Sequence, residues 1–462
     1  MQQTDQMQLK SSGQRDFPQY KHVPLVLILM FCCYVLIWYL QMGERWPALG
    51  SIRLEFIYGL ILIAIMPFLG VPFDSPLVKF ILLYLAMVIV QIPLSHDADH
   101  SMDIFFNRVV KFGFMGVFIA TFVKSPRDLR LFVLSFMLAW AKMGQEGIYG
   151  VLTGGMMWEN QGILRLHGST SLYHHPNSFS GLAVGTLPFI YYLFPVVSRM
   201  AKIGLLVMAV FTVNIIVFTG SRTGYVALAI FLILLFFRSK KKKLWAAATI
   251  PILVGAVVFT PVEYRQRFMS IFTLQEAEGS SAQTRIQILK DAWQVFMEHP
   301  AGVGVGAFPY VRQQMFNRIQ DTHNLYLEVA TNLGVQGFFA FMLFIGALIL
   351  TLVANYRSFK EQLEDLYSNE SRVWKDDSFY RFHAHVRDLR FMKAVSSAIV
   401  TFVIVRLALG MFGMDLYEIY WWFAAGSAIA LYKMREVAEM RTIDFVEETD
   451  HETQSGEAEA PV

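Results

Sequence analysis

The sequence predicts an all-α fold, a polytopic bundle of about twelve membrane-spanning helices with one long outward loop that contains amphipathic helices. Three observations lead to this prediction. Of the 462 residues, 55% are hydrophobic and only 16% are charged, which is far from the composition of a soluble protein. The apolar residues form blocks long enough to cross a bilayer, with short polar stretches between them. Lysine and arginine gather in alternate short loops, the charge pattern that orients membrane proteins.

The predicted spans follow one another along most of the chain. They are 24–40, 56–70, 77–95, 108–123, 130–150, 178–195, 203–219, 224–237, 244–260, 334–354, 395–412 and 416–432. The polar segment 1–23 precedes the first span without a small-residue cleavage site, so we expect that span to be retained as an anchor. The expected organisation is therefore a cytoplasmic N-terminal segment, a membrane domain over 24–433 and an acidic, disordered tail over 434–462.

Orientation follows from the basic cluster Arg238 to Lys243, because short loops rich in lysine and arginine remain in the cytoplasm. Alternation from that point makes 355–393 a cytoplasmic loop and places both termini in the cytoplasm. It places 261–333 outside as a large periplasmic loop. The other outward segments are 41–55, 96–107, 151–177, 220–223 and 415–418. The net charge of +3 is too small to indicate a nucleic-acid partner.

Several arginines in the outward segments run against this charge bias and invite a functional explanation. They are Arg165, Arg222, Arg265, Arg267, Arg285, Arg312 and Arg318. Arg222 differs from the others because it starts a helix at the membrane boundary, where an unpaired cation is costly and usually faces a polar cavity. A plainer alternative stays open for any single arginine, since long translocated loops tolerate basic residues.

The long outward loop has a helical pattern of its own. From Ala282 to Glu298, apolar residues recur at helical spacing with charged residues between them, which predicts an amphipathic helix on the membrane surface. It is followed by His299-Pro300 and by a run of alternating glycines, Gly302, Gly304 and Gly306. No strand–helix–strand pattern surrounds this run, so it indicates a close backbone approach or a tight turn and not a nucleotide-binding loop.

The segment Asp321 to Glu328 contains the strongest candidate for chemistry. We expect Thr322 to cap a helix that has His323 in its first turn. The positive end of a helix favours neutral imidazole near pH 7, which would make His323 a competent general base, and it also attracts anions. The helix should run on through Gly334 and Gly337, whose spacing would let a neighbouring helix pack closely. The alternative for His323 is a polar interfacial residue without a catalytic role.

Taken together, these motifs resemble the signature of the O-antigen ligase and O-antigen polymerase superfamily. The motifs are His323-Asn324 followed by Gly334-x-x-Gly337, Gly220-Ser221-Arg222-Thr-Gly224 at a helix start, Arg285 in the amphipathic helix, and His299-Pro300 with the glycine run. The resemblance covers about residues 165–340. Many relatives carry an acidic residue before a Pro-Asn pair, whereas this chain has His174-His175-Pro176-Asn177, which puts an acid role there in doubt.

The resemblance implies a glycosyltransferase of the bacterial inner membrane. Such an enzyme transfers a glycan from an undecaprenyl-pyrophosphate-type carrier to an acceptor hydroxyl at the outer face, with no metal and no other cofactor. It implies that Arg222, Arg285 and Arg165 bind the pyrophosphate, since fixed cations stabilise the charge that grows as the glycosidic bond breaks. His323 would remove the acceptor proton.

Further roles follow from the same resemblance. Asp321, Glu328 and Asn324 are candidates for orienting the imidazole, and Gly334 and Gly337 are structural. The implied partners are the lipid-linked glycan donor, a glycan or lipid-linked acceptor and the bilayer, with chain-length or export proteins as further candidates. The favoured product is a polymerised exopolysaccharide or O-antigen, and ligation to the lipid A core of lipopolysaccharide or to protein is the alternative.

Two other functions stay open. The outward motif His96-Asp97-Ala98-Asp99-His100 offers carboxylates and imidazoles for a metal-dependent glycosyl transfer, although a solvated loop is the commoner meaning of such a cluster. A transporter or flippase of an anionic solute or of a lipid-linked glycan would also use many spans. Against transport, the charges gather at one face, which suits a reaction at the membrane surface.

Overall fold

A computed structural model describes the chain from residue 18 to residue 457, apart from residues 161, 240, 244–246, 248, 250–260, 274–280, 369–375 and 414–415. Within these ranges the protein is built of helices, with one antiparallel hairpin formed by the strands β1 (Met157–Asn160) and β2 (Ile163–Leu166). The predicted all-α class is therefore confirmed for the part of the chain that the structure describes.

The helices follow in sequence order. Before the hairpin lie α1 (Leu25–Tyr39), α2 (Met42–Arg45), α3 (Pro47–Ser51), α4 (Leu54–Leu69), α5 (Pro76–Gln91), α6 (Ala98–Ile104), the π-helical segment η1 (Phe105–Val110), α7 (Lys111–Phe122) and α8 (Pro126–Thr153). After it lie the 3₁₀ turn η2 (Ser171–Tyr173), α9 (Pro176–Leu193), α10 (Arg199–Phe218), α11 (Arg222–Arg238), α13 (Val262–Thr273), α14 (Ser281–Glu298), α15 (Phe308–Phe316), α16 (Leu325–Ser368), α17 (Asp376–Leu409) and α18 (Ile419–Glu457).

Four helical stretches of the described chain are long and apolar enough to cross a bilayer: Ala98–Phe122, Arg199–Phe218, Leu325–Ser368 and Phe379–Leu409. Three further apolar helices, α1, α4 and α5, are shorter. The chain is thus a multi-pass membrane protein. Each predicted span overlaps a described helix except 244–260, which lies largely outside the described residues. The total of about twelve spans stays a prediction.

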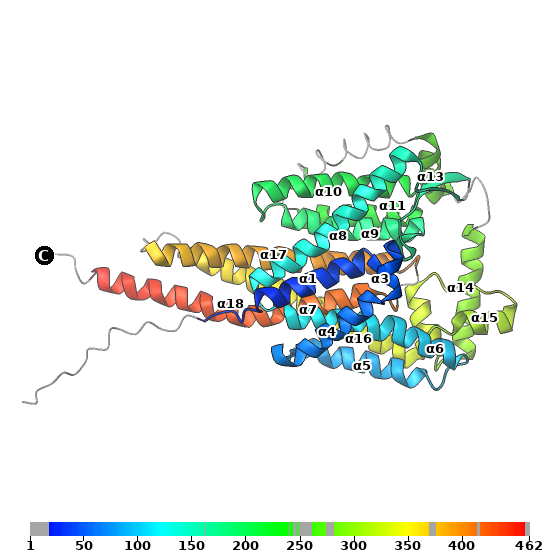
Figure 1. Cartoon of the computed structure of the whole chain (residues 1–462), viewed down its shortest axis with the longest axis horizontal. Helices are drawn as coiled ribbons and strands as arrows, with labels where there is room; N and C mark the ends of the chain where they lie inside the picture. Colours follow the sequence, from blue (N-terminus) through cyan, green and yellow to red (C-terminus); the bar gives the residue numbers. More distant parts are fainter. Residues whose placement is uncertain are drawn as a thin grey trace, which may run out of the picture.

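The long helices α16, α17 and α18 pack side by side along the length of the molecule (Figure 1). Helix α14 runs across one end of this bundle, in contact with α15 and with α16, and the C-terminal end of α18 lies at the opposite end (Figure 1). Two glycines bring α7 and α18 to backbone contact, because a Cβ on Gly426 would lie 2.3 Å from the carbonyl oxygen of Gly116. The end of the bundle that α14 crosses also carries the candidate active site.

Helix α14 matches the predicted amphipathic helix. One apolar face packs into the protein through Ile288, Ala292 and Val295, which are buried. A second apolar stripe is exposed and consists of Ile286, Leu289, Trp293 and Met297. Because these four residues recur at helical spacing, the exposed stripe has the form that a helix lying in a membrane interface needs.

The prediction that the tail is disordered is wrong for most of its length. We expected disorder over 434–462, but α18 continues as a helix to Glu457. The physical reason is an apolar pattern within the acidic sequence, since Met434, Ala438 and Phe445 are buried and α18 packs against both α16 and α17 in this region.

The predicted cytoplasmic loop 355–393 is also largely helical. The end of α16 and the start of α17 extend through it on the two sides of residues 369–375. Buried polar side chains join these helices to α18, since His385 lies 2.9 Å from the Thr442 hydroxyl and that hydroxyl donates to Gln362. The described parts of this segment are therefore packed extensions of α16 and α17.

The helix predicted to run through Gly334 and Gly337 is interrupted. Gly334 has φ 69° and ψ −172°, which breaks α16 near its start. The segment Pro300 to Gly304 fills the break with three backbone hydrogen bonds: Val303 N to Thr331 O (2.9 Å), Gly304 N to Asn332 O (3.0 Å) and Val335 N to Pro300 O (2.9 Å). A Cβ on Gly334 would lie 2.3 Å from the carbonyl carbon of Ala301. The glycine run is thus a close backbone approach, as predicted, but Gly334 admits a loop and not a neighbouring helix.

Gly334→Ala is expected to destabilise the protein, because a non-glycine residue at positive φ costs about 1–3 kcal/mol and the new Cβ would overlap backbone atoms. Gly346→Ala in the same helix is the matched control, since its Cβ would meet no atom within 4 Å. Thermal unfolding in detergent should show a lower midpoint for Gly334→Ala only. Equal midpoints for the two variants would contradict the role given to Gly334.

Candidate active site

A cavity of about 790 Å³ is lined by residues of the hairpin, α13 and α14, among others. Its lining includes Arg165 from β2, Arg222 from the start of α11, Arg285 from α14 and His323 from the loop before α16. These four residues come from four separate elements of the chain. The three predicted pyrophosphate ligands and the predicted base therefore share one cavity.

Arg165 is held rigidly at the wall of this cavity. It is 2% exposed, its Nε donates to the Thr219 carbonyl at 2.8 Å, and its Nη2 donates to the Asn177 side chain at 2.8 Å. Burial, and after it the nearby cations Arg267 and Arg222, lower the pKa of Arg165 to about 9. A guanidinium whose charged form is disfavoured in this way gains stability when an anion binds beside it.

The motif Gly220-Ser221-Arg222-Thr-Gly224 builds the start of α11. Gly220 has φ 55°, and Ser221 caps the helix by accepting the Gly224 amide at 3.2 Å. Gly224 is required by its neighbour, because a Cβ there would lie 1.9 Å from the hydroxyl of Ser180 in α9. Arg222 is the first residue of this helix and so lies where helix N–H groups also attract an anion.

His323 lies just before α16 and has a left-handed backbone, with φ 48°. The predicted cap is wrong. Asn324 caps the helix, because its Oδ1 accepts the amides of Tyr326 at 3.0 Å and Leu327 at 3.1 Å. Thr322 instead donates its hydroxyl to the Asn324 carbonyl at 3.1 Å, which stabilises the turn at His323. The imidazole is therefore presented by a turn and not by the first helical turn.

The pKa of His323 is lowered, as the sequence predicted, but for a different reason. Burial is the largest cause, and the cations Arg285 and Arg312 add to it. The same causes act on His175, whose pKa falls to about 4 through burial first and then through Arg165, His323 and Arg285. Both imidazoles are therefore neutral near pH 7, and a neutral imidazole can accept a proton.

Asp321, Glu328 and Asn324 are not part of the described cavity lining. Glu328 accepts the Leu416 amide at 3.2 Å, and Asn324 donates to the Met411 carbonyl at 3.3 Å. Burial raises the pKa of Asp321, against the opposite effect of His100 and Arg108. Their role in orienting the imidazole stays a prediction, and the contacts of Glu328 and Asn324 point to anchoring of the loop before α18.

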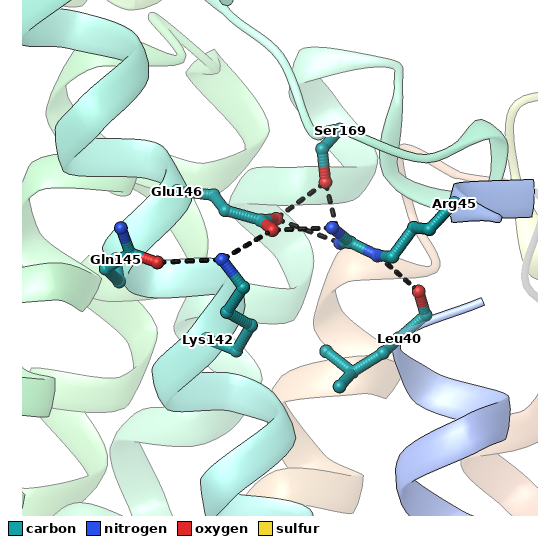
Figure 2. Close-up of polar contacts among 6 residues, drawn as sticks. All are labelled: Leu40, Arg45, Lys142, Gln145, Glu146 and Ser169. Atoms are coloured by element: carbon teal, nitrogen blue, oxygen red, sulfur yellow. Dashed lines mark hydrogen bonds and ion pairs between the residues drawn. The ribbon is translucent and has the colours of Figure 1, made fainter. Parts of the chain in front are cut away.

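A second set of contacts holds the loop that leads to His175 (Figure 2). The Arg45 guanidinium makes two hydrogen bonds to Glu146, at 2.5 and 2.9 Å, and a third to Ser169 at 2.8 Å. Beside it, both carboxylate oxygens of Glu44 accept the Ser171 amide, at 2.8 and 3.0 Å. Ser171 lines the cavity, so the short helix α2 and helix α8 fix this part of its wall.

The cavity also contains residues to which the sequence analysis gave no role. They are Arg108, His175, Arg267, Arg406 and Glu418. The sequence alone could have identified Arg406, because an arginine inside a predicted span usually faces a polar cavity. It donates to the Gly181 carbonyl at 3.0 Å, and its guanidinium carbon lies 3.6 Å from the centre of the Tyr420 ring. Glu418 accepts Arg108 at 2.5 Å, a pairing that no sequence motif indicates.

The residues of the alternative metal site have structural contacts. Asp97 caps α6 by accepting the His100 amide at 3.1 Å. The ring of His96 meets that of His299 edge-on, with 4.9 Å between ring centres. Among the residues that the structure describes, no group of three or more His, Cys, Asp or Glu side chains is arranged to hold a metal ion.

Comparison with known proteins gives one result for this region. The sequence profile of a family described as O-antigen ligase matches residues 207–342. The matched region contains Arg222, Arg285 and His323, whereas Arg165 and Glu418 lie outside it. A search of curated proteins finds no match.

Proposed function

From the premise that residues 207–342 belong to the O-antigen ligase family, we propose that the protein transfers a glycan from a polyprenyl-pyrophosphate carrier to an acceptor hydroxyl. The observation that supports this most directly is the shared cavity of a neutral histidine, His323, and several arginines. A leaving pyrophosphate needs fixed cations, and an attacking hydroxyl needs a base.

The arginines supply the electrostatic half of the reaction. Arg165, Arg222, Arg267 and Arg285 all line the cavity. Each guanidinium group can bind two phosphate oxygens at once and keeps its positive charge. The arginines therefore stabilise the pyrophosphate as negative charge develops on it. Pyrophosphate is already a good leaving group, and therefore the reaction requires neither a general acid nor a divalent metal.

His323 supplies the proton transfer. The neutral imidazole takes the proton of the acceptor hydroxyl while its oxygen attacks the anomeric carbon. The new glycosidic bond forms as the bond between that carbon and the pyrophosphate oxygen breaks, and the anomeric centre inverts. Within this class we favour polymerisation of an exopolysaccharide or O-antigen, with ligation to the lipid A core or to protein as the alternative.

A transfer assay with the purified protein and a lipid-linked oligosaccharide donor tests the proposed function. Transfer should release polyprenyl pyrophosphate in proportion to the glycan bonds formed, and EDTA should leave the rate unchanged. Loss of activity in EDTA that Mg²⁺ or Mn²⁺ restores would instead favour the metal-dependent alternative. Movement of an intact lipid-linked glycan across a vesicle membrane, with no bond formed, would favour the flippase.

We further propose that the site faces the periplasmic side of the inner membrane and that both termini are cytoplasmic, which follows from the basic cluster at Arg238 to Lys243. In a variant without Cys32 and Cys33, single cysteines at exposed Lys241 and Glu298 report the two sides. In intact spheroplasts, an impermeant thiol reagent should label position 298 and leave position 241 unlabelled. The reverse pattern would contradict the orientation.

The lowered pKa of His323 predicts how activity depends on pH. A general base works only when neutral, so kcat/KM falls as pH drops through the pKa of the free enzyme. Because burial and Arg285 lower that pKa, the fall should lie below the ordinary histidine value of about 6.5. A pH profile of kcat/KM measures it. A limb at or above that value would contradict the neutral-base assignment.

A further inference from the structure

The cavity has a second part whose chemistry differs from that of the pyrophosphate-binding arginines. Among the described lining residues, Glu418 is the one carboxylate in a wall that otherwise carries six arginines. Its Oε1 accepts Arg108 Nη1 at 2.5 Å. Arg108 belongs to η1, and π-helical turns are rare and frequently occur at functional sites.

The pairing changes what this part of the cavity can bind. Glu418 offsets the positive charge of Arg108, and its carboxylate repels phosphate, so the place beside this pair suits a sugar hydroxyl better than a pyrophosphate, even though Arg406 lies nearby. A carboxyl group has more acceptor lone pairs than Arg108 uses, so Glu418 can accept further hydrogen bonds from a ligand in the cavity. Such acceptor oxygens match the hydroxyl groups of a sugar.

The chain also connects this part to the base. The Leu325 amide, two residues after His323, donates to the Gly410 carbonyl at 2.6 Å. The cap residue Asn324 donates to Met411, and Glu328 in the first turn of α16 accepts the Leu416 amide. Glu418 lies two residues after Leu416, so these contacts tie its backbone to the segment that carries His323.

We propose that Glu418, held by Arg108, binds a hydroxyl of the acceptor sugar and so presents the attacking hydroxyl to His323. This assignment rests on the proposed function and adds an acceptor site to it. Glu418 takes no part in the proton transfer: the attacking hydroxyl loses its proton to His323, the glycosidic bond forms, and the pyrophosphate leaves. The alternative is a purely structural role, in which the pair of Arg108 and Glu418 fastens η1 to the start of α18, and the experiment must distinguish the two roles.

The test compares Glu418→Gln with Glu298→Gln, an identical change at an exposed residue outside the cavity lining. The donor is lipid-linked oligosaccharide extracted from the source membranes, and the acceptor is oligosaccharide released from it by mild acid. Loss of a hydrogen bond to a charged group should raise the acceptor KM of Glu418→Gln at least about tenfold, with the donor KM within about threefold. Glu298→Gln should behave as wild type.

Binding of undecaprenyl pyrophosphate serves as the folding control. If Glu418→Gln fails to bind it, Glu418→Asp replaces it, because the shorter carboxylate keeps the charge but withdraws from the sugar and should still raise the acceptor KM selectively. An acceptor KM equal to that of the control, or donor and acceptor KM rising together, overturns the acceptor site. A wild-type protein that forms no glycan bond overturns the proposed function, and this inference with it.

Discussion

His323→Ala is expected to slow glycan transfer by about 100- to 10,000-fold, the range that general-base catalysis supplies. The imidazole lines the cavity, and burial and Arg285 keep it neutral. Because the substitution removes the base and leaves the arginines in place, the loss should fall on kcat, while binding of undecaprenyl pyrophosphate should change little. Turnover with a purified lipid-linked donor, measured beside a binding assay, separates the two.

His383→Ala is the matched control, since His383 is exposed on α17 and lies outside the cavity lining. His323 precedes α16 and does not cap it, so its loss should leave the helix start intact. Turnover near the wild-type rate in correctly folded His323→Ala protein would remove the base assignment. His175 would then be the next candidate, as it is the other described imidazole in the cavity whose pKa is lowered.

The sequence predicts a residue of the cavity only where a local sequence pattern identifies it. Arg222 stands in a glycine-rich helix start and Arg285 in an amphipathic helix, and the structure brings both to His323. No such sequence pattern identifies Glu418 or Arg108. They meet across 310 positions of sequence, and their contact depends on how α18 packs against α7. Hydropathy locates helices, but it does not show which polar side chains will face one cavity.

The errors near His323 have a local cause. Thr322 and Asn324 are both good helix caps, and propensity alone does not choose between them. The left-handed turn at His323 decides in favour of Asn324. The break at Gly334 has a tertiary cause, because the free backbone groups of α16 are satisfied by a loop some thirty residues earlier, Pro300 to Gly304. A glycine in an apolar helical pattern gives no sign of such a partner.

Arg222→Lys is expected to reduce transfer substantially even though the charge is retained. A planar guanidinium grips two phosphate oxygens at once, whereas an ammonium binds as a single point charge. A hydrogen bond to a charged group contributes about 1.5–3 kcal/mol, so the loss of one such bond in the transition state corresponds to roughly 10- to 100-fold in kcat/KM for the donor. The measurement is the initial rate of donor consumption over a range of donor concentrations.

Arg265→Lys provides the comparison, because Arg265 is an exposed arginine of α13 outside the cavity lining. Arg222 starts α11, but the cap of that helix is Ser221, so lysine at position 222 should leave the helix start in place. Salt offers a second criterion, since added salt screens a point charge more than a paired, partly buried contact. Full activity in Arg222→Lys, with an unchanged dependence on salt, would reduce Arg222 to a general positive charge and leave the specific grip on pyrophosphate to Arg165 and Arg285.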